Sequence, residues 1–90
     1  MEHEIKQRLT KIELLTKCNE ITKQYCDKFY KHKNGDLYYA GKGTTINING
    51  TSYWGVLYHP CDNETMHIIF PITHTRPLCE FLDGRFELIE

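Results

Sequence analysis

The sequence predicts an α+β fold, in which an N-terminal amphipathic helix is followed by a small meandering antiparallel β-barrel of five to six strands. Two observations lead to this prediction. Residues 4–25 contain no Gly or Pro and are rich in residues that favour helix. From Phe29 to Ile89, apolar and polar residues alternate, as expected for half-buried strands. Short turn sequences divide this stretch at Asn34-Gly35, Gly41-Lys42-Gly43, Asn49-Gly50, Asp62-Asn63 and Asp83-Gly84.

We expect the 90 residues to form a single domain, with the helix over residues 1–27 and the barrel over residues 28–90. Ile5, Leu9 and Ile12 follow the spacing of one helical face, and the pattern resumes with a shifted phase after Leu14. One helix with a broad apolar stripe fits this pattern, and so do two helices that break near residues 16–19; we favour the single helix. A stripe of that width has to cover the barrel of its own chain or a twin helix in a homodimer.

The β region divides into six strand candidates and one helical turn. Pro71 cannot donate to a ladder and is expected at an edge or a strand end. The strands are expected over Lys28–Lys33, Asp36–Ala40, Thr44–Ile48, Ser52–His59, Thr65–Ile72 and Arg85–Ile89, with the helical turn at Leu78–Leu82. Alternation within these strands predicts an inward-facing set of Leu37, Tyr39, Ile46, Ile48, Trp54, Val56, Tyr58, Met66, Ile68, Phe70, Ile72, Phe86 and Leu88.

The net charge of −1 is unevenly distributed along the chain. Residues 1–34 hold eight Lys and Arg against five Asp and Glu, whereas residues 35–90 hold three against seven. Duplex nucleic acid is therefore an unexpected ligand, because a duplex binder usually carries a clear basic excess. No secretory signal or membrane-length apolar run is visible, so we expect a cytoplasmic protein without a membrane partner and with reduced cysteines.

Several short motifs carry a resemblance to a known family. They are Tyr30-Lys31-His32 followed by Gly35 and Tyr38, then Val56-Leu57-Tyr58, then Arg76-Pro77-Leu78 with Phe81. These residues resemble a family of small bacterial and phage proteins of unknown function, whose core reads approximately Y-R-H-Y-K-G-x-x-Y, V-V-Y and R-P-L-x-x-F. The resemblance implies a small barrel of the Src-homology-3 type over residues 29–89. The long N-terminal helix and the extra residues around Gly41–Gly50 depart from the family pattern, and the family supplies no activity.

No catalytic or cofactor motif stands out. His59, Cys61, His67, His74 and Cys79 lie in one half of the chain, but they lack the spacing of a zinc site, so we predict no metal. Cys61 beside His59 has no glycine-rich oxyanion turn after it, and no paired carboxylates are apparent. We therefore expect a protein that is not an enzyme and needs no cofactor.

Two segments are candidates for ligand binding. Gly41-Lys42-Gly43-Thr44-Thr45 offers glycines, a cation and hydroxyls suited to phosphate, although we favour an ordinary glycine-flanked hairpin turn, which needs no ligand. If Trp54 faces inward, then Tyr53, Gly55 and His59 share the opposite face, with a groove over the glycine unless the helix covers it. Rings stack on nucleobases and cations meet phosphate. The candidate ligand-binding residues are therefore Tyr53, Gly55, His59, His74, Arg76, Lys42 and Thr44.

These features support three hypotheses for function. The first is a non-catalytic protein that captures a nucleotide-like small molecule, for example a phage anti-defence sponge that sequesters a signalling nucleotide. The second is a module that inhibits or adapts a host enzyme through the helix face of Ile5, Leu9 and Ile12 or through an exposed barrel edge. The third is a small barrel that binds nucleic acid through Lys28, Lys31 and Lys33.

Overall fold

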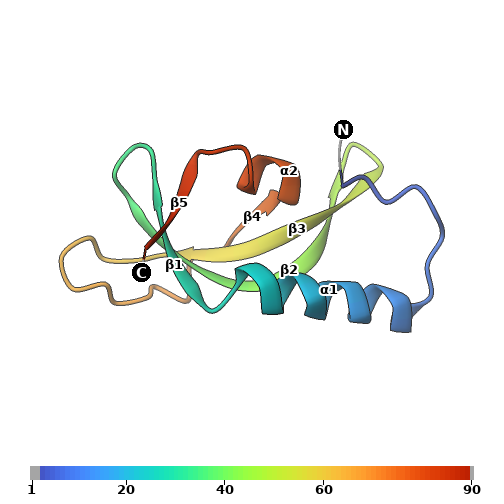
Figure 1. Cartoon of the computed structure of the whole chain (residues 1–90), viewed down its shortest axis with the longest axis horizontal. Helices are drawn as coiled ribbons and strands as arrows, with labels where there is room; N and C mark the ends of the chain where they lie inside the picture. The colour runs from blue at the N-terminus through green and yellow to red at the C-terminus, as the bar shows by residue number, and fades with distance from the viewer. Residues whose placement is uncertain (1–2, 90) are drawn as a thin grey trace.

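The computed structural model describes residues 3–89, so the ends of the predicted domain at residues 1, 2 and 90 lie outside the described part. The protein is an α+β fold with one main helix and a five-stranded antiparallel sheet in the order β4-β3-β2-β1-β5, which confirms the predicted class (Figure 1). The elements are α1 (Lys11–Tyr25), β1 (Lys28–His32), β2 (Leu37–Ile48), β3 (Thr51–Pro60), β4 (His74–Pro77), α2 (Leu78–Phe81) and β5 (Phe86–Ile89).

The sheet is strongly bent, but its hydrogen-bonded ladder does not close, because β4 and β5 occupy its two ends. Side chains join the two ends instead. The ring of Tyr58 on β3 lies 5.5 Å from that of Phe86 on β5, and the Arg76 guanidinium on β4 lies 5.7 Å from the Phe86 ring centroid. These side-chain contacts therefore close the side of the core where β4 and β5 do not pair through their backbones.

The main helix begins at Lys11, and the prediction that it begins near residue 4 is wrong. Thr10 and Glu13 form a reciprocal cap, in which Thr10 Oγ1 accepts from Glu13 N–H at 3.1 Å and Glu13 Oε1 accepts from Thr10 N–H at 3.0 Å. Before this cap the chain is not helical, and its first described residues pair with β3: Ile5 N–H donates to the Ser52 carbonyl, and Trp54 N–H donates to the His3 carbonyl. We call residues 3–5 the N-terminal arm. The backbone groups of the arm therefore form hydrogen bonds with β3 instead of a helix.

From Lys11 to Tyr25, α1 is one unbroken helix, so the alternative of two helices is also wrong. Cys26 ends it in an extended conformation.

β2 is one long strand where two had been predicted. Its twelve residues pair with β3 from Tyr38↔Pro60 to Ile48↔Thr51, with a register shift between Ala40 and Lys42. The expected turn at Gly41-Lys42-Gly43 is therefore a β-bulge, in which one extra residue at Gly41 is accommodated without reversing the chain. The turn at Asn49-Gly50 is as predicted, with positive φ at both residues (51° and 83°).

The segment Thr65–Ile72, predicted as a strand, is a loop. Within residues 3–89, its one ladder contact is an isolated bridge between Ile68 and Cys61. The Asp62 carboxylate accepts from the N–H groups of Glu64 and Thr65, which turns the chain, and Ile69 N–H donates to the Pro60 carbonyl. The strand that follows this loop is β4, which was not predicted and ends at Pro77. The helical turn α2 and the last strand, β5, follow as predicted.

Four of the thirteen predicted inward-facing residues, Trp54, Val56, Tyr58 and Phe86, are buried or pack against the core. Val56 and Tyr58 are buried and Trp54 packs against the core, as expected. On β2 the phase is opposite to the prediction, because Tyr38 and Ala40 face the core whereas Leu37, Tyr39 and Ile46 lie on the other face. Met66, Phe70 and Ile72 are exposed on the loop. The core is completed by Ile21, Cys26, Tyr30, Leu78 and Phe81.

Helix α1 lies along β2 beyond the point where β1 ends (Figure 1). Its approach is so close that a Cβ at Gly43 would lie 2.6 Å from the Cys18 carbonyl oxygen and 2.7 Å from Ile21 Cβ. Gly43 N–H donates to Thr22 Oγ1 at 2.8 Å, so a helix side chain supplies the acceptor that a neighbouring strand would otherwise provide. Only glycine fits at this contact.

We predict that Gly43→Ala destabilises the protein by about 2–3 kcal/mol, because the added methyl group meets helix backbone that cannot move aside by itself. The matched control is Gly41→Ala, two residues away on the same strand. Its Cβ would meet its nearest neighbour, His59 Nε2, at 3.4 Å, so it should change stability by less than about 1 kcal/mol. Urea unfolding of both variants measures the difference; equal stabilities would contradict the assigned contact.

Candidate functional site

The register of the sheet sorts the predicted ligand-binding residues onto two faces. Residues directly opposite each other in an antiparallel pair point to the same side, and neighbours along a strand alternate. Lys42↔Leu57 and Tyr39↔His59 are such pairs on the side away from Val56 and Tyr58. We call this side the outer face. Tyr53, Gly55, His59, Lys42 and Thr44 belong to it.

His74 and Arg76, the other two predicted residues, lie on the core side of the sheet. They pair with Tyr58 and Val56, respectively. Arg76 Nε donates to the Tyr58 hydroxyl at 3.3 Å, and Arg76 Nη1 pairs with Glu80 Oε1 at 3.2 Å. The His74 ring lies 5.3 Å from that of Tyr58. The expectation that these two side chains share a surface with His59 is wrong. They lie opposite Val56 and Tyr58, whose side chains point to the other face of β3 from that of His59.

The predicted groove over Gly55 is absent, since the Ile46 side chain fills that space. A Cβ at Gly55 would lie 2.2 Å from Ile46 Cδ1 and 2.7 Å from the Arg76 carbonyl oxygen. Tyr53 lies farther along β3, where it bridges Glu4 of the N-terminal arm. Gly55 and Tyr53 thus serve packing and pairing at this end of the sheet, and α1 lies against the other face.

A hollow of about 440 Å³ lies farther along the outer face, and it contains two of the predicted residues, His59 and Lys42. We call it the aromatic groove. The Phe70 ring lies 5.1 Å from the His59 ring and 6.3 Å from the Tyr39 ring. Phe70 is 58% exposed. The lining residues are Tyr39, Gly41, Lys42, Leu57, His59, Phe70 and Thr73.

The bulge at Gly41 brings Lys42 to this groove. Without the extra residue, Tyr39 and Lys42 would lie on opposite faces, since they are three positions apart. With it, Lys42 pairs with Leu57, which precedes His59 by two residues and shares its face. The exposed Lys42 ammonium therefore stands beside the rings on the outer face, where a cation can meet an anionic group of a stacked ligand.

The hydrogen bond of His59 fixes which ring nitrogen is free. Its Nδ1 lies 3.0 Å from the Ile72 carbonyl oxygen, which can only accept, so Nδ1 carries the proton. In the neutral ring Nε2 is then an acceptor, and it lies 3.4 Å from the position of a Cβ on Gly41, toward the groove. The same hydrogen bond tethers the loop that carries Phe70.

Thr44 lines a different hollow, of about 380 Å³, between α1 and β2, which also includes Lys42 and Gly43. Its hydroxyl donates to the Thr45 carbonyl at 3.4 Å. Gly41-Lys42-Gly43-Thr44-Thr45 runs as extended strand, and it does not form the looped cradle of N–H groups that a phosphate-binding turn presents.

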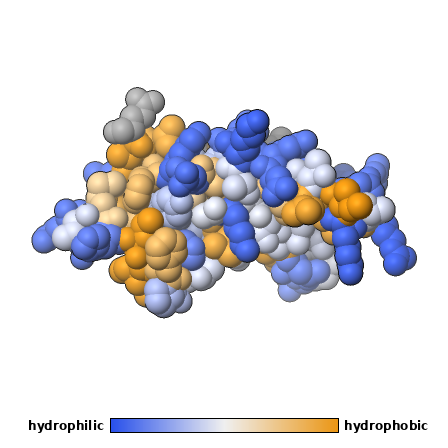
Figure 2. Space-filling model, turned by 90° about the horizontal axis from the view of Figure 1, so that it is seen from below, coloured by the Kyte–Doolittle hydropathy of each residue, from blue (hydrophilic) through white to orange (hydrophobic). Residues whose placement is uncertain are grey.

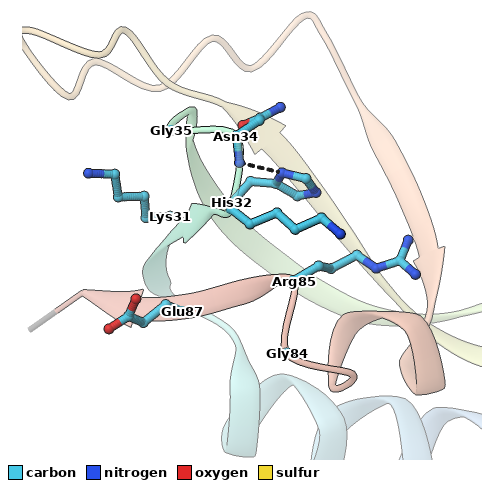
Figure 3. A pocket seen from close by; sticks show the side chains of 8 residues that line it. Lys31, His32, Asn34, Gly35, Gly84, Arg85 and Glu87 are labelled. Carbon is cyan, nitrogen blue, oxygen red and sulfur yellow. Dashed lines mark hydrogen bonds between the residues drawn. The ribbon is translucent and has the colours of Figure 1, made fainter.

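A third hollow, of about 420 Å³, lies where β1 ends and β5 begins and is shown in Figure 3. Lys31, His32, Lys33 and Arg85 all line it. Arg85 is already neutralised, because its guanidinium pairs with Asp83 at 2.6 Å and with Glu80 at 3.4 Å. Asn34 N–H donates to His32 Nδ1 at 3.2 Å, drawn as a dashed line in the figure. The third lysine of the predicted basic hairpin, Lys28, is elsewhere, where its ammonium donates to the Gln24 carbonyl.

The cysteines do not form a reactive centre. Cys61 is buried, and burial raises the pKa of its thiol, which disfavours the thiolate that a nucleophile requires. Burial likewise raises the pKa of Cys26 to about 11. Among residues 3–89, no three His, Cys, Asp or Glu side chains converge in a way that would hold a metal ion.

The predicted interaction face of Ile5, Leu9 and Ile12 does not form one helical stripe, because α1 starts late, but Leu9 and Ile12 line one hollow of about 360 Å³ with Trp54. Ile5 lies in the N-terminal arm and Leu9 in the segment before the helix, whereas Ile12 is on the first turn and 76% exposed. Leu15, one turn later, is 60% exposed. Figure 2 shows a small apolar patch over α1 and a larger one at the end of the molecule that bears the loop between β3 and β4.

Tyr39, Leu57, Phe70 and Thr73 are groove residues that sequence reasoning missed as ligand contacts. Tyr39 and Phe70 were assigned to the core by alternation. The sequence signal that bears on the face of Lys42 is Gly41, because glycine inside a strand pattern often marks a bulge. The bulge changes the faces only of residues that follow it on β2, so it does not account for Tyr39, which precedes it, or for Phe70, which lies on the loop.

Comparison of the chain with protein-family models, curated proteins and solved structures finds no match in any of the three. No helix within residues 3–89 has the length and apolar character needed to span a membrane.

The Tyr39 hydroxyl donates to Asp27 Oδ1 at 2.5 Å, and this bond together with burial raises the pKa of Tyr39 to about 12. The folded protein therefore holds this proton more tightly than the unfolded chain. Its contribution to stability is complete below the ordinary value near 10 and is lost as the pH rises through about 12.

We predict that Asp27→Asn shifts one tyrosine titration to lower pH, because the charged acceptor of the Tyr39 proton is removed. Phenolate absorbance during an alkaline titration measures the shift. The Tyr39→Phe variant identifies the component, since the titration near pH 12 should vanish in it. An unchanged titration in Asp27→Asn would contradict the assigned hydrogen bond.

Proposed function

We propose that the protein is a non-catalytic capture domain that binds a nucleotide-like ligand in the aromatic groove of its outer face. The observation that carries this proposal is the meeting of three rings, Tyr39, His59 and Phe70, with the Lys42 ammonium at one hollow. A nucleobase stacks on rings of any kind, and its phosphate is attracted to a lysine beside them.

The composition of the groove favours binding over chemistry. No carboxylate is among the residues that line the groove, so the groove itself offers no carboxyl pair for general acid–base catalysis. His59 Nδ1 is committed to the Ile72 carbonyl, which leaves Nε2 as an acceptor for an N–H or hydroxyl group of the ligand.

The biological role that we attach to this proposal is sequestration of a signalling nucleotide, as by a phage anti-defence protein. The residues that resemble a family with phage members support this role, and so does the strand order β4-β3-β2-β1-β5 with a helical turn between β4 and β5, which is compatible with a barrel of the Src-homology-3 type. A domain of 90 residues with a surface groove can bind a small signal without processing it.

We predict that screening the protein by differential scanning fluorimetry against a library of linear and cyclic nucleotides finds at least one that raises its melting temperature. At about 100 times its Kd, a ligand adds about 2.7 kcal/mol, or roughly 10–20 °C for a domain of this size. Phe70→Ala should weaken binding about 5- to 100-fold through lost stacking, and Lys42→Ala about 10- to 100-fold through the lost charge. Both side chains are exposed, so folding should be preserved.

The matched control is Ile12→Ala, which removes an exposed apolar side chain on the first turn of α1; Ile12 lines neither the groove nor the hollow between α1 and β2 that contains Lys42. It should bind the same nucleotide with unchanged affinity. If no nucleotide in the library shifts the melting temperature of the unmodified protein, the capture proposal fails.

A second candidate function is docking on a protein through α1. Ile12 and Leu15 are separated by three residues and therefore lie on one side of the helix, where both are well exposed. This observation favours a host enzyme or a second copy of the chain as partner, with the apolar strip of α1 as the contact.

We predict that Ile12→Glu together with Leu15→Glu abolishes co-purification of such a partner, or converts a dimer to a monomer in light scattering. Both positions face solvent in the single chain, so the melting temperature should change by only a few degrees. An unmodified protein that is monomeric and retains no partner would eliminate this candidate.

A further inference from the structure

The outer face continues from the aromatic groove onto β1, at a position set by the register. Phe29 pairs with Tyr39, and Lys31 pairs with Leu37. Both therefore point to the same side as Tyr39, His59 and Lys42. One surface thus runs over three strands, from Lys42 on β2 to Lys31 on β1.

Rings follow one another along this surface. The Phe70 and Tyr39 rings are 6.3 Å apart, and the Tyr39 and Phe29 rings are 5.3 Å apart. Phe29 and Tyr39 are half-buried, so each is held by its surroundings yet still presents part of the ring. A succession of anchored rings is the stacking platform of proteins that bind single-stranded nucleic acid.

Cations stand at both ends of the ring series. Lys42 is at one end, and Lys31 lines the hollow at the other end together with Lys33. The five steps along β2 from Leu37, the partner of Lys31, to Lys42 span roughly 13–16 Å at about 3.3 Å per residue, the lower value allowing for the bulge. A single nucleotide, with one base beside its phosphate, cannot place a base on the rings and phosphate on both lysines.

We propose that the ligand of the outer face is a single-stranded oligonucleotide, which stacks on Phe70, Tyr39 and Phe29 and places phosphates at Lys42 and Lys31. This inference rests on the proposed function and names the class of its ligand. A duplex does not fit the platform, because its bases are stacked on each other and do not present their faces to protein rings. The small net charge of the chain agrees with a ligand held by stacking as much as by phosphate contacts.

One residue of the surface opposes the ligand and supplies a sharp test. Glu87 on β5 pairs with Lys31 and lines the same hollow, so its carboxylate repels a phosphate there. Figure 3 shows Lys31 and Glu87 on neighbouring strands of this hollow. Removing this charge should strengthen the binding of a ligand that reaches Lys31 and leave a shorter ligand unaffected.

The experiment compares a fluorescein-labelled single-stranded octanucleotide of mixed sequence, as DNA and as RNA, with the mononucleotide and with a duplex of the same sequence. Fluorescence anisotropy measures the labelled strands, and calorimetry measures the mononucleotide. We expect the octanucleotide to bind at least about tenfold more tightly than the mononucleotide and more tightly than the duplex.

The variants separate the two ends of the surface. Lys31→Ala should weaken octanucleotide binding about five- to tenfold and reduce the slope of log affinity against log salt by about 0.7, with mononucleotide binding unchanged. Lys42→Ala should weaken both ligands, and Glu87→Gln should strengthen only the octanucleotide. Lys11→Ala, which removes the same charge from the start of α1, is the control and should change neither.

The outcomes distinguish this inference from the proposal beneath it. Equal affinities for mononucleotide and octanucleotide, with no effect of Lys31→Ala, would overturn the inference and leave the capture function standing. Preference for the duplex would also overturn it. Failure of every nucleotide and oligonucleotide to bind would overturn both.

Discussion

The extra residue at Gly41 is the constraint on which the helix contact and the candidate site both depend. Before it, Tyr38 and Ala40 face the core; after it, the core-facing phase passes to Gly43. One insertion in the ladder thus turns Lys42 outward, beside the rings, and turns Gly43 toward α1. In a regular strand with Tyr38 and Ala40 facing the core, Lys42 would lie beneath the helix, where burial of an unpaired ammonium costs several kcal/mol. The bulge at Gly41 therefore keeps the Lys42 ammonium from being buried under α1 and places it at the edge of the outer face.

The close approach of α1 follows from that phase. With no side chain at Gly43, the helix backbone rests against β2, and Thr22 accepts the hydrogen bond of the Gly43 N–H that the end of β1 leaves without a strand partner. Ile21 then enters the core with Val56 and Phe81. The N-terminal arm has a similar role at β3, because it pairs with the part of β3 that β4 does not reach. Short strands at the sheet ends are thus extended by other parts of the chain, which protects backbone groups that would otherwise be free to pair with another molecule.

The loop between β3 and β4 explains how so many apolar side chains come to be exposed beside the groove. The Asp62 turn fixes its start, and the His59–Ile72 hydrogen bond fixes its end. The Asp62 carboxylate has a lowered pKa, chiefly because the N–H groups of Thr65 and Glu64 donate to it. A segment tied at both ends can hold Phe70 against His59 and Tyr39 without a ladder of its own. A functional ring on a loop positioned by a rigid sheet is a common arrangement in binding proteins.

The sequence by itself determined the α+β class, the positions of β1, β3, α2 and β5, and the turn at Asn49-Gly50, because local propensity and turn chemistry act over a few residues. It also contained the start of α1, since Thr10 and Glu13 have the spacing of a reciprocal cap. Only the tertiary structure decided that Gly41 is a bulge, that residues 65–72 form a loop, and that Lys42 stands with Tyr39 and Phe70. Each of these features depends on which segment, distant in the sequence, supplies the hydrogen-bond partners. The alternation of apolar and polar residues along one strand does not specify the strand that pairs with it.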